Sequence, residues 1–113
     1  MRSFFKVRPI IITVPVLLYS GMAVFPFILI QNKELAGNDT LIRHEQIHLK
    51  QQVEMLVIPF YVIYLINYLI NLVIYRQHDK AYREIIFERE AYANEQNGDY
   101  LSQRPVWSFM KYV

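Results

Sequence analysis

The feature that most constrains this chain is a run of 21 residues, positions 55–75, that carries no charged side chain. An apolar run of this length is long enough to cross the hydrocarbon core of a bilayer as a helix. The sequence has 113 residues, so the remaining residues offer little material to cover so apolar a helix. The run therefore predicts a membrane-associated protein, and the alternative is an ordinary buried core helix.

Five of the polar and aromatic residues of this run follow a regular pattern. They recur at spacings of 3, 4, 3 and 4, and they are Tyr61, Tyr64, Tyr68, Asn71 and Tyr75. This spacing places them on one stripe of a helix, because an α-helix has 3.6 residues per turn. The other faces consist of Val, Ile and Leu. We therefore expect one side of the helix to pack on protein while the other sides meet lipid.

Composition excludes several classes of protein. Hydrophobic residues make up 54% of the chain and charged residues 19%, the reverse of a disordered chain. The absence of cysteine excludes disulfide scaffolds, thiolate zinc fingers, iron–sulfur sites and cysteine nucleophiles, so a metal site must use His, Asp and Glu. A formal net charge of +2 is too small to argue for nucleic-acid binding, and we expect no nucleic-acid partner.

The fold class that these patterns predict is mainly α, with membrane-embedded helices in a single domain over residues 1–113. The domain divides into an N-terminal apolar segment (7–30), an H-E-x-x-H helix (40–58), an apolar helix (60–75), a third-ligand helix (79–97) and an interfacial tail (104–113). Asp39 or Thr40 would cap the H-E-x-x-H helix. The tail mixes aromatic and basic residues, which suits a membrane–water interface.

The N-terminal apolar segment admits three interpretations. Basic residues precede it, and small residues follow at the spacing that a signal peptidase reads: Arg2, Lys6, Arg8, Gly21 and Ala23. Because the apolar character continues as far as Ile30, an uncleaved anchor is favoured over a removed signal peptide. Residues 27–31 could instead form one short edge strand, since they are β-branched and aromatic and follow Pro26. The basic residues favour a cytoplasmic N-terminus; a full first span would then place the site outside, whereas the strand would leave it inside.

The sharpest chemical signal is the H-E-x-x-H motif, residues 44–48. The i, i+4 spacing puts the imidazoles of His44 and His48 on one face of a helix, close enough to share a metal ion. Glu45 can reach a metal-bound water as a general base, because the metal lowers the pKa of that water toward ~7. The motif predicts a zinc site with His44 and His48 as ligands.

A catalytic zinc needs a third protein ligand and an open fourth position. Glu88 is the strongest candidate, because it lies on the apolar stripe of the segment 79–97, where a carboxylate is costly to bury unless it is paired or binds a metal. The alternatives are a carboxylate paired with a base at the helix surface, or a different third ligand: Glu90, Glu84 or His78.

The two motifs together resemble those of the gluzincin zinc peptidases. The similarity is strongest to the membrane-embedded kinds, the CAAX-prenyl-protease and heat-shock membrane peptidases and the antirepressor peptidases of β-lactam sensors, which carry H-E-x-x-H and then E-x-x-A-D. The resemblance implies that His44, His48 and Glu88 bind Zn²⁺ and that Glu45 is the base. It also implies that residues 27–31 match the edge strand that holds substrate in extended form. The sequence departs from the family at Tyr92, where the family has an Asp that orients a ligand His.

Geometry decides whether Glu88 can reach the two histidines. If residues 55–75 continued straight on from the H-E-x-x-H helix, His48 and Gln77 would lie about 43 Å apart. Pro59 cannot donate the helical hydrogen bond and restricts Ile58, so a break is expected there. A returning helix would bring Glu88 back to the level of His48. We therefore predict a bent or re-entrant helix pair that dips into the bilayer, with the zinc site near its surface.

The function that these features predict is a minimal membrane-associated zinc metallopeptidase. The donor to the developing oxyanion is open among Tyr82, Tyr92, His78 and Arg89. The alternative is a catalytically inert small membrane subunit or scaffold that retains the motif, and a third interpretation is zinc-dependent hydrolysis of a non-peptide substrate. The expected partners are the lipid bilayer, a peptide or membrane-proximal protein substrate and a membrane protein. The expected location is the bacterial inner membrane, with the side of the active site left open.

Overall fold

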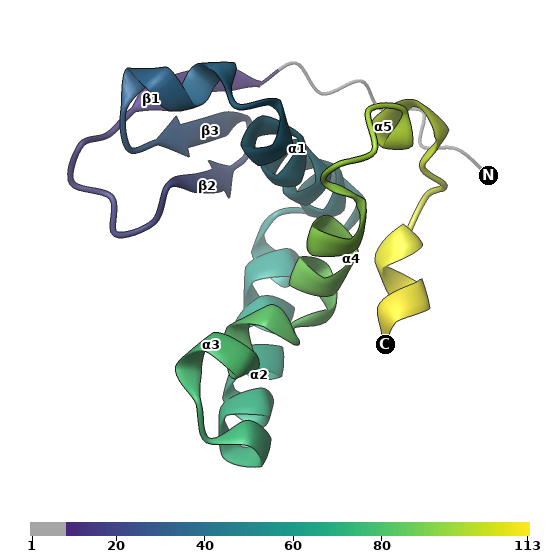
Figure 1. Cartoon of the computed structure of the whole chain (residues 1–113). Coiled ribbons are helices and arrows are strands. Elements are labelled where there is room, and N and C mark those ends of the chain that lie inside the picture. Colours follow the sequence, from purple (N-terminus) through teal and green to yellow (C-terminus); the bar gives the residue numbers. More distant parts are fainter. Residues whose placement is uncertain (1–8) are drawn as a thin grey trace.

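The computed structural model describes residues 9–113, so the expectation built on Arg2, Lys6 and Arg8 lies outside the described part. The described chain is mainly helical, with one small sheet (Figure 1). The elements are β1 (Ile10–Thr13), β2 (Gly21–Val24), β3 (Phe27–Ile30), η1 (Lys33–Gly37), α1 (Asp39–Glu54), α2 (Ile58–Tyr75), α3 (His78–Arg83), α4 (Ile86–Asn94), α5 (Tyr100–Gln103) and η2 (Ser108–Tyr112). The prediction of a mainly α fold is confirmed.

Residues 10–30 form a three-stranded sheet, so the prediction of an uncleaved anchor there is wrong. The physical reason is that β-branched residues dominate this segment and prolines interrupt it, a combination that disfavours a helix. The predicted strand exists as β3, but its position is central: the strand order is β1-β3-β2, with β1 parallel and β2 antiparallel to β3. The edge strand nearest to α1 is β2.

Helix α1 carries the H-E-x-x-H motif and is shorter than the predicted 40–58. Its N-cap is Asn38, whose Oδ1 accepts from the backbone N–H of Leu41 at 3.1 Å, so the expected caps Asp39 and Thr40 are helical residues instead. The helix ends at Glu54, and the chain reverses through residues 55–57, where Leu56 adopts a left-handed conformation with φ 57°. Helix α2 then begins with a proline in its first turn, as the break expected at Pro59 requires.

Helix α2 uses its two sides differently. The predicted stripe packs on protein: the side chains of Tyr64, Tyr68 and Asn71 hydrogen-bond to Glu88, to His78 and to the carbonyl of Ala81. The opposite side is a row of exposed aliphatic residues: Val62, Leu65, Ile66, Leu69, Ile70, Val73 and Ile74. Among residues 9–113, α2 alone is long and apolar enough to cross a membrane, a criterion of length and composition only. The expectation of several membrane-embedded helices thus reduces to one candidate.

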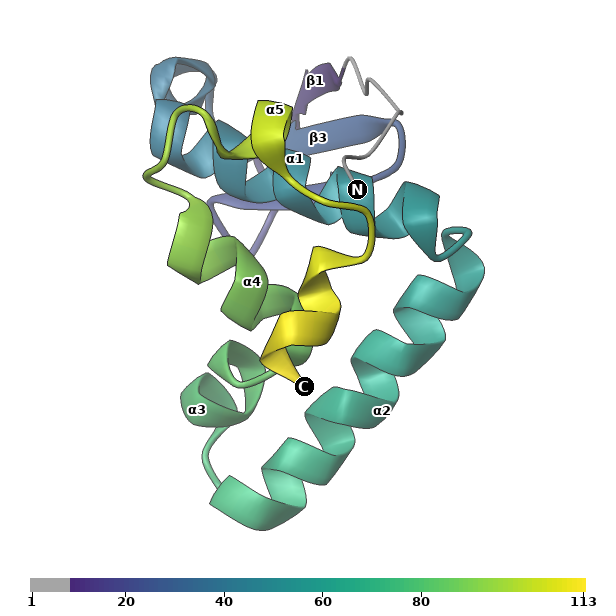
Figure 2. The same ribbon diagram turned by 90° about the vertical axis from the view of Figure 1, so that its right-hand side faces the viewer.

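The predicted single helix over 79–97 is wrong, because the chain breaks between α3 and α4. Ile85 is extended, with φ −61° and ψ 133°, and is fully buried between the two helices. The N–H of Ile86, which opens α4, donates to the side-chain oxygen of Asn67 on α2 at 2.9 Å. A residue of α2 therefore caps α4 and directs it back toward α1. Figure 2 shows α4 and η2 filling the angle between α1 and α2.

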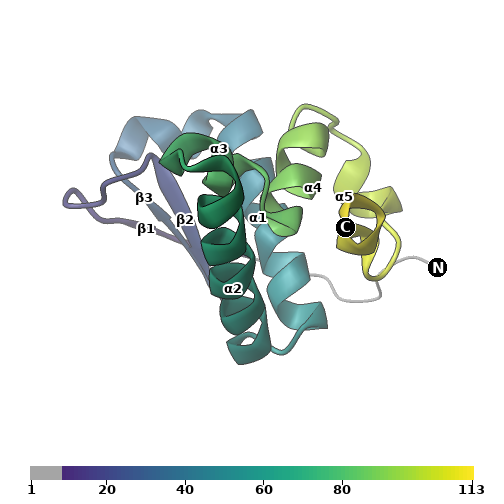
Figure 3. The same ribbon diagram turned by 90° about the horizontal axis from the view of Figure 1, so that it is seen from below.

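Two apolar clusters fix these elements. One joins the sheet to α1 through Ala23, Ile28, Ile30 and Leu49, and the other joins α2, α4 and η2 through Phe60, Ile85, Phe87 and Phe109. The sheet and the C-terminal segment (residues 100–113, with α5 and η2) lie on opposite sides of α1 (Figure 3). The predicted interfacial tail therefore contributes Phe109 to the core, while Trp107 and Met110 are exposed.

A buried ion cluster attaches the C-terminal segment to α1 and α4. Arg104 is fully buried, and its guanidinium donates to Glu90 on α4 at 2.6 Å and to Glu54 on α1 at 2.7 Å. Both carboxylates are almost fully covered, so each needs this partner.

We predict that Arg104→Ala lowers the free energy of unfolding by about 3–5 kcal/mol, because it leaves two buried carboxylates unpaired. Denaturant unfolding followed by circular dichroism measures this loss. Arg89→Ala is the matched control: Arg89 lies at the surface, 3.9 Å from Glu84, and should cost at most about 1 kcal/mol. Equal losses in the two variants would contradict the role given to Arg104.

Candidate metal centre

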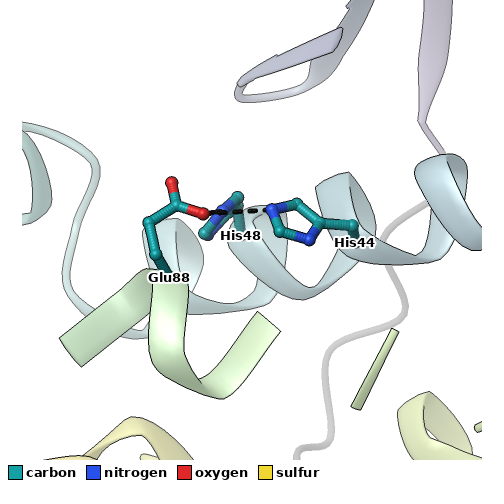
Figure 4. A group of neighbouring side chains, drawn as sticks. All are labelled: His44, His48 and Glu88. Carbon is teal, nitrogen blue, oxygen red and sulfur yellow. Dashed lines mark hydrogen bonds and ion pairs between the residues drawn. The ribbon is translucent and has the colours of Figure 1, made fainter. Parts of the chain in front are cut away.

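Three buried side chains from two helices converge on one point. The motif on α1 places the rings of His44 and His48 with centroids 4.9 Å apart, and Glu88 approaches from α4 (Figure 4). Glu88 Oε1 lies 3.0 Å from Nε2 of each histidine. One ligand atom from each of the three residues lies within 4.8 Å of the others, and all three residues are buried. This cluster can hold a metal ion.

The Nδ1 atoms of both imidazoles contact side chains outside the cluster, so the Nε2 atoms are the ones that can bind a metal ion. His44 Nδ1 lies 2.8 Å from Glu95 Oε2, and His48 Nδ1 lies 2.8 Å from Gln51 Oε1. A carboxylate and an amide oxygen only accept, so both Nδ1 atoms carry the proton. Nε2 of each ring faces Glu88 Oε1 at 3.0 Å. An Nε2 atom that has lost its proton has the lone pair that binds a metal ion.

The orientation of Gln51 is itself determined by α4. Gln51 Nε2 donates to the carbonyl of Phe87 at 3.1 Å and to Glu90 Oε1 at 3.0 Å. The amide group therefore presents its oxygen to His48. Because Phe87 directly precedes Glu88, the same turn of α4 supplies one ligand and orients the partner of another.

Glu95 and Gln51 belong to the candidate site, and the sequence analysis did not identify them. Glu95 follows Glu88 by seven residues and Tyr92 by three, so all three lie on one helical face, and that spacing is a signal in the sequence. Tyr92 packs its ring against His44 with centroids 4.5 Å apart. The carboxylate that orients His44 thus comes from Glu95, about one helical turn further along.

The charges of the cluster are strongly coupled. Burial would lower the pKa of His48, but the charge of the Glu88 carboxylate and its hydrogen bond raise it to about 9. Burial would raise the pKa of Glu88, but the charge of His48 and the hydrogen bonds from both imidazoles hold it well below its usual range. Tyr64 also donates to Glu88 Oε2 at 2.6 Å. A metal ion at the site would replace a proton on His48, so its binding releases a proton.

Glu45, next to His44 in the chain, is buried but lines open space in the protein. It lies between two cavities of about 300 and 240 Å³ and lines both. No residue among 9–113 hydrogen-bonds to this carboxylate. Burial raises the pKa of Glu45, although the neighbouring His48 and His44 oppose the shift. A Cβ at Gly21 would lie 3.2 Å from Glu45 Oε2, so the glycine lets the edge strand β2 come this close.

Of the four candidates for the third ligand, only Glu88 joins the cluster. Glu90 is buried, and its carboxylate accepts from Arg104 and Gln51 and does not reach the histidines. Glu84 lies at the surface. His78 hydrogen-bonds to two tyrosines and lines the larger cavity without joining the cluster.

The candidates for an oxyanion donor occupy different places. Tyr82 lines both cavities, on either side of Glu45. Burial, together with the charge of Glu88, raises the pKa of Tyr82, so its hydroxyl stays protonated. Tyr92 lines the smaller cavity and His78 the larger. Arg89 lines neither cavity and donates to a backbone carbonyl of the C-terminal segment.

No family model, curated protein or solved structure matches this chain. The interpretation of the site rests on its own geometry.

We predict that the purified protein binds one divalent metal ion per chain and that His44→Ala and Glu88→Ala each abolish this binding. Each variant keeps only two ligands, and we expect the ion to dissociate from two ligands during purification at micromolar protein concentration. Elemental analysis after metal loading measures the stoichiometry. His78→Ala and Glu84→Ala are matched controls outside the cluster and should keep the ion. Full metal content in Glu88→Ala would contradict the three-residue site.

We predict that Glu95→Ala weakens metal affinity by roughly 10- to 100-fold without changing the stoichiometry, because His44 loses the partner that holds its ring and tautomer. Competition with a chelating indicator measures the affinity. Glu95→Gln retains a side-chain oxygen, so its metal affinity should lie between those of the wild type and Glu95→Ala. Unchanged affinity in Glu95→Ala would show that the contact has no influence on the ligand.

Proposed function

We propose that this protein is a membrane-associated zinc metallopeptidase that hydrolyses peptide bonds. The observation that carries the proposal is the convergence of two Nε2 atoms and a carboxylate oxygen within 4.8 Å, with the Glu45 carboxylate beside them on an open cavity. Two imidazoles and one carboxylate are a donor set that suits zinc, and three protein ligands leave one position open. The zinc ion would act as a Lewis acid and lower the pKa of water.

Glu45 has the properties of a general base in this reaction. Its carboxylate has no competing hydrogen bond within the described chain, and burial raises its pKa toward the range in which it can both take and return a proton. It would accept a proton from the attacking water and pass it to the leaving amine. Tyr82, which lines both cavities and stays protonated, is the best-placed donor to the carbonyl oxygen.

The edge of β2 supports a substrate bound in extended form. Ser20 O accepts from Gln31 N, so Met22 and Val24 also pair with β3, and the peptide groups of Gly21 and Ala23 point to the free edge. The carbonyl of Ala23 is occupied by two side chains of the protein, but the edge at Gly21 lies next to Glu45. A peptide strand added at Gly21 would bring its backbone beside the base.

The exposed side of α2 supports a location at a membrane. Only 11% of the residues of α2 are buried, and the exposed side of the helix carries aliphatic residues without a charge. Contact with lipid would remove this apolar surface from water, where its exposure is unfavourable. The charged residues of α3 and the cluster itself favour a site near the membrane surface, with a peptide or membrane-proximal protein as substrate. The bacterial inner membrane remains the predicted location.

The second candidate function is a catalytically inert membrane subunit that retains the motif. The observation in its favour is Tyr92, which replaces the Asp of the similar peptidases. The contact between Glu95 and His44 weighs against it, because it supplies the hydrogen bond that the missing Asp would make.

We predict that Glu45→Gln keeps the bound zinc and lowers peptidase activity by about 10²–10⁴-fold, because the amide cannot accept the proton. Mass spectrometry of an unbiased peptide mixture, incubated with the protein in detergent, measures cleavage. Glu84→Gln is the matched surface control. Equal cleavage by wild type and Glu45→Gln, or a cellular phenotype that survives the substitution, would favour the inert subunit.

A further inference from the structure

The larger cavity is lined by aromatic rings from three parts of the chain. Helix α2, helix α3 and the loop before β2 contribute them: Tyr19, Phe60, Tyr61, Tyr64, Tyr68 and Tyr82. Glu45, His48 and Glu88 line the same cavity. A molecule in this cavity would therefore contact the rings and the metal centre at once.

The tyrosines line this cavity as apolar rings, because the protein itself satisfies most of their hydroxyls. Four of the five tyrosine hydroxyls make hydrogen bonds to protein groups. The pairs are Tyr61 with the carbonyl of Ala23 (2.8 Å), Tyr64 with Glu88 (2.6 Å), Tyr68 with His78 Nδ1 (2.8 Å) and Tyr19 with His78 Nε2 (3.2 Å). An apolar ligand in the cavity would leave none of these four groups unpaired.

The volume and charge of the cavity restrict what fits. A cavity of about 150 Å³ lined by apolar side chains is large enough for benzene. This cavity, at about 300 Å³, has room for one ring and for a peptide group next to the metal centre. No Lys or Arg occurs among the described residues that line it, whereas Glu45 and Glu88 do. An acidic side chain would therefore lie beside two carboxylates and would find no Lys or Arg to pair with.

We propose that this cavity is the specificity subsite, and that it selects peptides with an aromatic or large aliphatic side chain next to the bond that is cleaved. The inference rests on the proposed function, since it places a substrate residue beside the proposed catalytic groups. An extended segment paired to β2 at Gly21 directs alternate side chains to one side, so one of them can enter the cavity while the backbone stays beside Glu45.

The test uses zinc-loaded full-length protein in detergent and a set of peptides that differ at one position: Phe, Leu, Ala, Asp or Lys. Cleavage is measured by mass spectrometry as kcat/KM. Burial of the side chain predicts that Phe and Leu exceed Ala by roughly 10- to 100-fold and that Asp is the poorest. Uniform cleavage, or preference for Ala or Asp, would overturn the inference and leave the peptidase proposal intact.

A variant pair tests whether the cavity causes the preference. Tyr68→Ala removes one wall and should reduce the Phe-to-Ala ratio by about 5- to 10-fold. Tyr75→Ala is the matched control, because Tyr75 lies on the same helix outside the cavity, under the ammonium of Lys80, and should leave the ratio unchanged. An unchanged ratio in Tyr68→Ala would assign the preference to another surface.

Binding separates failure of the inference from failure of the peptidase proposal. The same peptides, carrying a fluorophore, are titrated into zinc-loaded Glu45→Gln protein and followed by anisotropy. If no peptide is cleaved by wild type but the Phe peptide binds at least tenfold more tightly than the Ala peptide, the result supports the proposed subsite and contradicts the proposed peptidase activity. If peptides bind without preference, the subsite falls. If none binds or is cleaved, both proposals fall.

Discussion

A carboxylate buried between two imidazoles is the interaction on which the arrangement of α1 and α4 depends. Removing the charge of Glu88 from water is expensive unless partners replace the lost hydration. His44 and His48 supply two of these partners and Tyr64 the third, from α1 and α2. Helices α1, α2 and α4 must therefore meet at the two carboxylate oxygens of Glu88. The reversal of the chain at residues 55–57 allows this.

Hydrogen bonds extend from this cluster into the C-terminal segment. Gln51 joins His48 to Glu90, and Glu90 joins Arg104, which also reaches back to α1 through Glu54. The segment after α4 supplies no ligand, yet it neutralises the carboxylate that orients Gln51. Packing of Phe109 against Phe87 holds the same segment against α4. Protein interiors are dense, so a shift in this segment would be transmitted to the metal ligands.

Helix α2 serves two environments. Its polar stripe supplies Tyr64 to bind Glu88 and tyrosine rings to line the larger cavity, and Asn67, next to the stripe, caps α4. Its other side is aliphatic and exposed. A soluble core helix would bury both sides, whereas a helix at a protein–lipid boundary needs only one. The pattern of polar residues along α2 is the one that the proposed membrane location requires.

The sequence by itself determined the local features. Spacing within one helix brings His44 and His48 to one face, Pro59 indicates that a new helix begins near it, and the stripe on residues 55–75 identifies the packed side. Each of these depends on geometry over at most a few turns. The burial of Glu88 on its stripe also pointed to the third ligand.

Only the tertiary structure decided the contacts between distant segments. The anchor expected at 7–30 is a sheet, whose central strand depends on pairing that a single segment does not encode. Asn67 of α2 caps α4 and so interrupts the predicted helix 79–97. Glu95 reaches His44 on α1 only because α4 packs against α1. These side chains acquire their roles only when the chain has folded, because hydrogen bonds act over about 3 Å in space rather than along the sequence.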